Sequence, residues 1–258
     1  MRPPAIEAPD AKIQIDSVEF QGTPHLSTQA LEQLVISLKS RQLGARPDWI
    51  SDEETVVRNA WQEQGYFRAL VEVVPHLLRA ELDRQYFVLT IRVEDGPQYR
   101  MAGIRFRENG ALPSDQLRRL MPLQEGDLFN VAKIRDGIEA IRRLYVSLGF
   151  IDATFEPDLE INEQSSTILL SLTLDEQKRY SIGTVEVLGP DPITKERIKA
   201  EFPLGQIFNG LVDRIFKKYR SVLPPDASPE NDVEVLRDSK NGLVTLRFDF
   251  RTCLQSPN

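Results

Sequence analysis

Residues 126–150 read GDLFNVAKIRDGIEAIRRLYVSLGF, and the spacing of apolar residues in this stretch decides the fold. Asn130 stands where its side chain can cap a helix that begins at the next residue. Apolar residues then recur at three- and four-residue steps, as on one buried helical face: Val131, Ile134, Ile138, Ile141, Tyr145 and Leu148. Gly149 follows, and glycine commonly ends a helix in the left-handed conformation. The stretch therefore predicts a loop, an amphipathic helix and its terminal glycine.

After Gly149 the apolar spacing changes from helical to alternating, which predicts a hairpin with one apolar and one wet face. The alternating residues are Ile151, Ala153, Phe155, Leu159 and Ile161 and, beyond a polar turn, Ile168, Leu170, Leu172 and Leu174. Upstream, residues 99–107 predict a strand, and Ser114 is placed as the N-cap of a shorter helix. The unit thus reads strand, helix, helix, strand, strand over about 80 residues.

The same order of elements recurs on both sides of this unit. Met121-Pro122-Leu123 and Phe202-Pro203-Leu204 match each other, and each precedes an amphipathic helix. In the preceding unit, Ser51 to Glu54 fits a capping box for the second helix, and residues 68–74 and 86–93 form the hairpin. The following unit is less regular, with strands expected at 184–188, 233–236 and 243–250 and helices at 193–202 and 211–219.

The pattern predicts an α+β chain of three tandem β-α-α-β-β units, each a three-stranded mixed sheet covered on one face by two helices. We expect the units to span residues 11–97, 98–178 and 179–251. The junctions 93–99 and 174–180 are short and polar, and both lead directly from one unit's last strand to the next unit's first. Short junctions predict an elongated rod with limited bending.

Composition narrows the class of protein. The net charge of −7 and the dispersed lysines and arginines argue against nucleic-acid binding. No apolar run approaches the roughly 18 residues that cross a bilayer. Residues 1–10 lack the apolar core of a signal peptide, so we expect either a trimmed export signal or a cytosolic protein. Cys253 is the single cysteine and cannot form an internal disulfide.

The residue types that carry catalysis or bind metals do not form a recognisable constellation. His25 and His76 lie in different expected elements without the neighbours that a zinc site requires. Asp52-Glu53-Glu54 is placed in the first turn of a helix, where acidic residues interact favourably with the helix dipole. We expect no cofactor, no metal, no small-molecule substrate and no enzymatic activity. The alternating acidic residues between Asp152 and Glu160 leave cation binding open beside the plainer interpretation of a solvated face.

Taken together, these features resemble the POTRA (polypeptide-transport-associated) family. The residues that carry the resemblance are the loop Gly126-Asp127-Leu128-Phe129-Asn130, the helix ends Leu148-Gly149-Phe150 and Gly65-Tyr66-Phe67, and the strand end from Val93 to Gly96. The resemblance extends from about residue 11 to 251, and its specificity lies in the order of the motifs rather than in any one of them.

The resemblance implies a function in protein assembly or secretion. Similar tandem arrays lie in the periplasm, ahead of a membrane β-barrel, in outer-membrane assembly factors of the BamA and TamA type. The expected partners are unfolded or nascent outer-membrane proteins, other envelope assembly proteins, and a β-barrel in the same or a neighbouring chain; the expected location is the periplasm, associated with the outer membrane. A cell-division adaptor of the FtsQ type and a small α/β enzyme are the alternatives, and three repeated units argue against the first.

The binding surface is expected at the first strand of each closing hairpin. Pro75 and Pro157 occupy similar places in these strands, and proline is tolerated chiefly at sheet edges because it lacks the N–H that a central strand donates. An open edge pairs with an incoming chain through its backbone. The residues predicted to bind protein in this way are Arg68, Leu70, Glu72, Val74, Asp152, Thr154, Glu156, Asp158 and Glu160.

Overall fold

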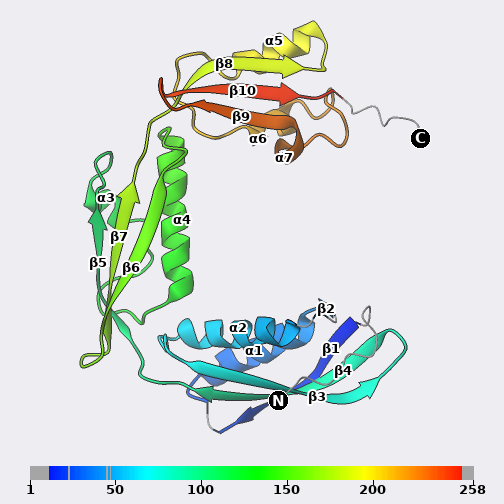
Figure 1. Cartoon of the computed structure of the whole chain (residues 1–258), viewed down its shortest axis with the longest axis vertical. Helices are drawn as coiled ribbons and strands as arrows, with labels where there is room; N and C mark the ends of the chain where they lie inside the picture. The colour runs from blue at the N-terminus through cyan, green and yellow to red at the C-terminus, as the bar shows by residue number, and fades with distance from the viewer. Residues whose placement is uncertain (1–11, 23, 45, 47, 252–258) are drawn as a thin grey trace. The chain divides into compact units, whose positions relative to one another are not determined.

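The computed structural model describes residues 12–22, 24–44, 46 and 48–251 (Figure 1). Within this part of the chain, the strands form three separate sheets, and helices follow the opening strand of each. The expected α+β class is therefore confirmed, with an opening strand, helices and a hairpin in each of three repeats; the third repeat has a short additional helix before its hairpin. No helix among the described residues is both long and apolar enough to cross a bilayer. Cys253 lies outside the described residues.

The first sheet has the order β2-β1-β4-β3. Its strands are β1 (Lys12–Gln21), β2 (Leu43–Gly44), β3 (Leu70–Ala80) and β4 (Arg84–Glu94), and its helices are α1 (Thr28–Ser40) and α2 (Trp49–Gln62). The expected three strands gain a fourth, β2, which pairs with the start of β1 while its Leu43 is buried. Two residues are too few to show alternation, so the sequence pattern carries no signal for β2.

The middle and third sheets have the orders β5-β7-β6 and β8-β10-β9. The middle group consists of β5 (Arg100–Arg107), α3 (Ser114–Arg118), α4 (Val131–Ser147), β6 (Thr154–Asn162) and β7 (Thr167–Asp175). The third consists of β8 (Ser181–Leu188), α5 (Pro192–Ala200), α6 (Asp213–Lys218), α7 (Pro229–Asp232), β9 (Val233–Asp238) and β10 (Leu243–Asp249). In all three sheets the last strand of the hairpin is central, so its first strand lies at an edge.

Apolar residues of helices and strands meet in a core beside each sheet. In the first sheet, Leu38, Val57 and Trp61 from the helices pack with Leu89 and Ile91 of β4, all fully buried. Beside the third sheet, Ile198 and Ile215 of the helices pack with Leu246 and Phe248 of β10. The apolar helix faces and the apolar strand faces that the sequence spacing predicts therefore pack against each other in the same core.

By the density of internal contacts the described chain divides into two compact units, and the dividing line crosses the middle sheet. The first unit runs to Arg105 and adds Met121–Asp136 and Leu159–Ser171. The second takes Phe106–Leu120, Gly137–Asp158 and the chain from Leu172. Domain boundaries near residues 97 and 178 stay a prediction.

Two pairs of backbone hydrogen bonds, each called a clasp below, have the same pattern. In each, a tyrosine just before the next sheet's opening strand bonds to the glycine after a helix, and a phenylalanine bonds to that tyrosine. In the first compact unit, the Tyr99 N–H donates to the Gly65 carbonyl (2.8 Å) and the Phe129 N–H donates to the Tyr99 carbonyl (3.0 Å). In the second, Tyr180 donates to Gly149 (2.8 Å) and Phe208 donates to Tyr180 (3.0 Å).

The aromatic residue four positions before each clasp glycine reaches an acidic residue just beyond the central strand. The Trp61 indole N–H donates to the Asp95 carboxylate, and the Tyr145 hydroxyl donates to Glu176 Oε1 at 2.8 Å. Burial, together with this hydrogen bond, raises the pKa of Tyr145 well above its usual range. Both rings lie fully in the core and use their polar tips to anchor the chain end of a strand, as buried Trp and Tyr generally require.

Glu53 of α2 is a buried carboxylate with an incomplete set of partners. Arg41 Nε donates to Glu53 Oε1 at 2.8 Å, whereas Glu53 Oε2 has no hydrogen-bond partner among the residues that the structure describes. Burial raises the pKa of Glu53 above 4.5, and Arg41 offsets only part of that rise. The acidic triplet therefore does not act as one solvated first-turn cluster, because only Asp52 lies in the first turn of α2.

Glu53 predicts a dependence of stability on pH. The folded chain holds its proton at a pH where the unfolded chain has released it, so the free energy of unfolding falls as pH rises from 4.5 through the raised pKa. Glu53→Gln should flatten this part of the curve, measured by urea unfolding at a series of pH values. Glu32→Gln on the exposed surface of α1 is the control and should keep the wild-type slope; the same slope in Glu53→Gln would contradict the assignment.

Candidate protein-binding edges

The sheet orders place both predicted binding strands at edges, because within the described residues β3 pairs only with β4 and β6 only with β7. Seven of the nine predicted residues lie within these strands: Leu70, Glu72, Val74, Thr154, Glu156, Asp158 and Glu160. Arg68 and Asp152 do not, and for these two the prediction of a strand position is wrong. Each lies in the turn after a clasp glycine, where the N–H of the next residue bonds back to Tyr66 or Phe150.

Arg68 and Asp152 instead form ion pairs with the hairpin of the following sheet. Arg68 Nη1 lies 2.6 Å from Glu163 Oε1 in the first compact unit. Asp152 Oδ1 lies 2.7 Å from Arg237 Nε in the second. The two pairs occupy corresponding places with the charges exchanged, and they explain both side chains without any external partner.

The backbone of β3 turns alternate residues toward the open edge. The Val73 N–H donates to Glu54 Oε1 of α2 (3.4 Å) and so points away from β4. Because hydrogen-bonded and non-hydrogen-bonded pairs alternate along an antiparallel ladder, Val71 and Pro75 face outward with Val73. The predicted residues Leu70, Glu72 and Val74 therefore present side chains beside the edge, whereas the outward backbone groups belong to their neighbours.

Glu54 contacts this edge and does not have the capping role that the sequence pattern predicts for it. The expected capping box fails because α2 begins at Trp49, upstream of Ser51, and its N-cap Asp48 makes no side-chain cap hydrogen bond. Glu54 thus lies one turn inside the helix, where its carboxylate reaches the Val73 N–H. With Pro75 lacking an N–H, two successive outward donors in the middle of β3 are removed.

The edge strand of the middle sheet, β6, has one solvent-exposed face and contains one proline. Thr154, Glu156, Asp158 and Glu160 are all exposed, whereas Phe155 between them is buried. The β6 strand also contains Pro157, which has no N–H to donate to β7, so its nitrogen must face the open side. The acidic row is therefore a solvated face beside an edge with one missing donor.

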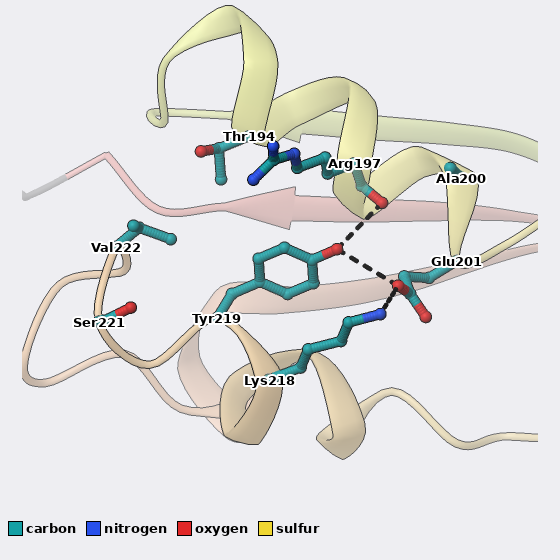
Figure 2. Close-up of a pocket in the computed structure, with 8 residues that line it drawn as sticks. All are labelled: Thr194, Arg197, Ala200, Glu201, Lys218, Tyr219, Ser221 and Val222. Atoms are coloured by element: carbon teal, nitrogen blue, oxygen red, sulfur yellow. Dashed lines mark hydrogen bonds and ion pairs between the residues drawn. The ribbon is translucent and has the colours of Figure 1, made fainter.

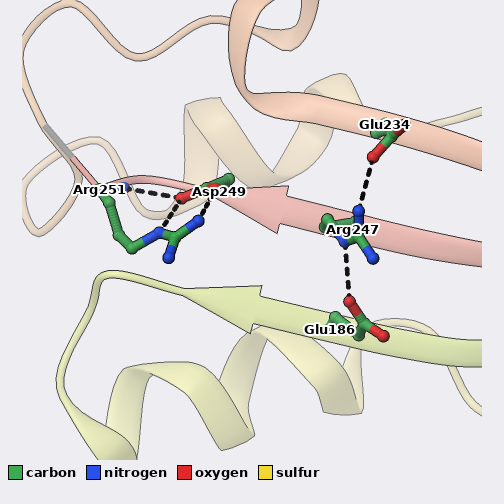
Figure 3. Close-up of polar contacts among 5 residues, drawn as sticks. All are labelled: Glu186, Glu234, Arg247, Asp249 and Arg251. Carbon is green, nitrogen blue, oxygen red and sulfur yellow. Dashed lines mark hydrogen bonds and ion pairs between the residues drawn. The ribbon is translucent and has the colours of Figure 1, made fainter. Parts of the chain in front are cut away.

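An arginine-centred polar ladder crosses the exposed face of the first sheet. Arg92 on the central strand β4 donates to Gln21 Oε1 of β1 (2.7 Å) and to Glu72 Oε2 of β3 (3.0 Å). In the third sheet, Arg247 on β10 donates to Glu186 of β8 (2.8 Å) and to Glu234 of β9 (3.0 Å), as Figure 3 shows. Such cross-strand pairs fix the register of the outer strands against the central one.

In the middle sheet the ladder arginine comes from the other outer strand. Arg105 Nη1 of β5 lies 3.5 Å from Glu160 Oε1 of β6, and the Ser171 hydroxyl of the central strand β7 donates to the same oxygen. Glu72 and Glu160, both predicted to bind a partner, are thus held by their own sheets. Their carboxylates position the edge strands rather than extend freely toward an incoming chain.

The strand β9 is a third edge that the nine predicted residues omit. Its sequence, VEVLRD, contains no proline, in contrast to β3 and β6, and Leu236 within it is 39 % exposed. The alternation of the hairpin predicts this strand, but it contains no proline to indicate that it lies at an edge. A strand without proline keeps all its backbone N–H groups. Of the three hairpin edges, β9 therefore lacks the loss of outward donors that proline causes in β3 and β6.

Comparison with known proteins identifies the class. Residues 99–177 match the POTRA family (surface antigen variable number repeat). The POTRA3–5 region of Haemophilus influenzae BamA superposes with a TM-score of 0.63 at 18 % sequence identity, covering 92 % of this chain and 96 % of that one. The fold is therefore that of consecutive POTRA domains.

Two curated relatives are outer-membrane assembly factors. A putative outer membrane protein assembly factor of Treponema pallidum is 21 % identical over 235 residues, covering 86 % of this chain. The outer membrane protein assembly factor BamA of Buchnera aphidicola is 27 % identical over 179 residues, covering 67 % of this chain. The chain is thus similar over much of its length to outer-membrane assembly factors, and its matches span 28 % of the length of each relative.

Proposed function

We propose that this chain is a non-enzymatic, periplasmic protein-binding scaffold for outer-membrane protein assembly or polypeptide secretion. It would bind client or partner strands by backbone pairing at the edges β3 and β6. The observation that carries the proposal is the order of strands, which leaves the first strand of each hairpin at an edge. The names of the relatives, outer-membrane assembly factors, support the process in which such a scaffold would work.

The partners that fit these edges are extended chains, because a backbone ladder requires an unpaired strand on both sides. Unfolded or nascent outer-membrane proteins, other envelope assembly proteins and a β-barrel in the same or a neighbouring chain satisfy that requirement. We place the scaffold in the periplasm, associated with the outer membrane, where such chains would be met. Pairing through the backbone needs little side-chain specificity, which suits a carrier of many clients.

The blunted edges predict weak and reversible binding. Pro75, Pro157 and the carboxylate of Glu54 remove outward donors, so an incoming strand cannot complete a continuous ladder on β3 or β6. The same devices protect the edges from pairing with one another. We expect dissociation constants of micromolar or weaker, that is about −8 kcal/mol or less favourable.

An NMR titration of the full chain tests the proposal. Extended peptides with alternating apolar and polar residues should shift the amides of residues 68–76 or 152–160. The shifts should saturate at micromolar to millimolar peptide, because short blunted ladders provide few hydrogen bonds.

Val71→Pro is the matched variant for this titration. Because the Val71 nitrogen faces away from β4, proline there removes an outward donor without breaking the ladder inside the sheet. The variant should lose the peptide-induced shifts on β3 and keep those on β6. Its melting temperature should fall only as far as the lost packing of the Val71 side chain requires. Shifts confined to a helix groove, or no binding at millimolar peptide, would show that edge pairing is the wrong mechanism.

A further inference from the structure

A groove lies between α5 and the chain that follows α6, beside the third sheet. It has a volume of about 570 Å³. Figure 2 shows Arg197 and Ala200 on the α5 side, Ser221 and Val222 on the opposite side, and Tyr219 between them. This α5–α6 groove shares no residue with the strand edges described above.

The base of the α5–α6 groove is held by an internal hydrogen-bond network. The Tyr219 hydroxyl lies 3.2 Å from both the Arg197 carbonyl oxygen and Glu201 Oε1. Lys218 Nζ donates to the same Glu201 oxygen, and this contact holds the pKa of Glu201 below its usual value. The negative charge of Glu201 is therefore neutralised within the protein, and Tyr219 is fixed as a half-buried floor.

Arg197 is the charge in the groove that no side chain neutralises. Its guanidinium is exposed, and within the described part of the chain no carboxylate lies in ion-pair range of it. The surrounding segment is basic as well: residues 191–220 contain seven lysines and arginines against four aspartates and glutamates, in a chain of net charge −7. The groove thus lies in a locally positive part of an acidic protein and keeps one planar cation available.

Apolar surface flanks this cation. Val222 on the far wall is 53 % exposed, and Ile193, one helical turn before Arg197, is 67 % exposed. A guanidinium binds a carboxylate through two parallel hydrogen bonds, and such a pair is stronger than one between neutral groups. The chemistry that fits is therefore a carboxylate with an apolar side chain next to it.

We propose that the α5–α6 groove is a docking site for an acidic segment of a partner protein. A glutamate or aspartate of that segment pairs with Arg197, and the neighbouring apolar side chain covers Val222 and Ala200. A concave site whose described lining holds Arg197 outside any ion pair, beside the apolar Ala200 and Val222, suits one side chain of a polypeptide. A membrane surface would instead engage the exposed basic residues around the groove, such as Lys217, rather than Arg197 within it.

The test uses the peptide Pro-Glu-Leu-Pro-Glu-Leu with the full chain. The prolines prevent a continuous backbone ladder, so binding of this peptide is separate from pairing at the strand edges. Arg197 side-chain and 218–222 amide signals should shift in an NMR titration, whereas residues 68–76 and 152–160 should not. Arg197→Gln should weaken binding at least about tenfold, consistent with loss of a charge-assisted pair. A peptide with Gln in place of Glu should bind as poorly.

Lys217→Gln is the matched control, because Lys217 is an exposed cation of α6 that does not line the groove. It should bind the peptide like the wild type. Equal binding by Arg197→Gln, equal binding of the Gln peptide, or no binding at millimolar peptide would overturn the proposal. Vesicles of anionic phospholipid form the second arm: Lys217-dependent sedimentation with vesicles, without peptide binding, would replace the protein partner by a lipid surface.

Discussion

Gly149→Ala is expected to destabilise the second compact unit by on the order of 3 kcal/mol, since it combines backbone strain with a blocked contact. Gly149 has φ +93°, and a Cβ there would lie 2.9 Å from the Tyr180 carbonyl oxygen and 2.8 Å from Ile207 Cγ2. That carbonyl accepts the Phe208 N–H, so a methyl group displaces both hydrogen bonds of the clasp. Gly65→Ala should act alike in the first unit, where the Cβ would lie 2.9 Å from the Tyr99 carbonyl.

The chain supplies a matched control for the clasp. Gly205, in the same compact unit as Gly149, has φ +80°, but among the described residues a Cβ there would meet no atom within 4 Å. Gly205→Ala therefore adds backbone strain alone, about 1 to 2 kcal/mol. Hydrogen exchange at the Tyr180 and Phe208 amides separates the two effects, because only Gly149→Ala should abolish their protection. Equal thermal shifts and equal exchange in both variants would show that the clasp contributes nothing beyond the glycine conformation.

Phe129→Ala is expected to cost about 3 kcal/mol through lost burial and the cavity left behind. Phe129 and Phe208 are buried in equivalent places: they are 0 % and 3 % exposed, and each donates its N–H to the clasp tyrosine. The Phe129 ring also meets Phe67 edge-on at 5.1 Å.

Thermal melts measure this loss directly. Leu82→Ala is the comparison, because Leu82 is fully exposed and its removal leaves no cavity. A melting temperature of Phe129→Ala equal to that of the wild type would refute the assigned core role. A shift confined to Phe129→Ala would support it.

The repeat was predictable because its signals are local and recur. The change from three- and four-residue steps to alternation at Gly149 marks where α4 ends and the hairpin begins, and the prolines mark which hairpin strand lies at an edge. Both signals come from residues close together in the chain. They need no knowledge of which distant segments meet.

The features that escaped prediction depend on contacts between distant residues. The Glu54 carboxylate reaches the Val73 N–H only because α2 packs against β3, and a capping box has the same residue types at the same spacing. Arg68 and Asp152 continue the alternation of the strands that follow them, yet the turn after each glycine keeps them out of the ladder. The α5–α6 groove joins Arg197 to Val222 across two short helices, and neither helix carries a motif.

The exchanged charges of the two ion pairs bear on how this repeat array can change by recombination. Joining the first repeat directly to the third would place Arg68 opposite Arg237, and duplicating the middle repeat would place Asp152 opposite Glu163. Both products bring like charges together where the present order has opposite ones. Each such ion pair contributes no more than about 1 kcal/mol. The order of charges therefore disfavours arrays with fewer or more repeats but does not prevent them.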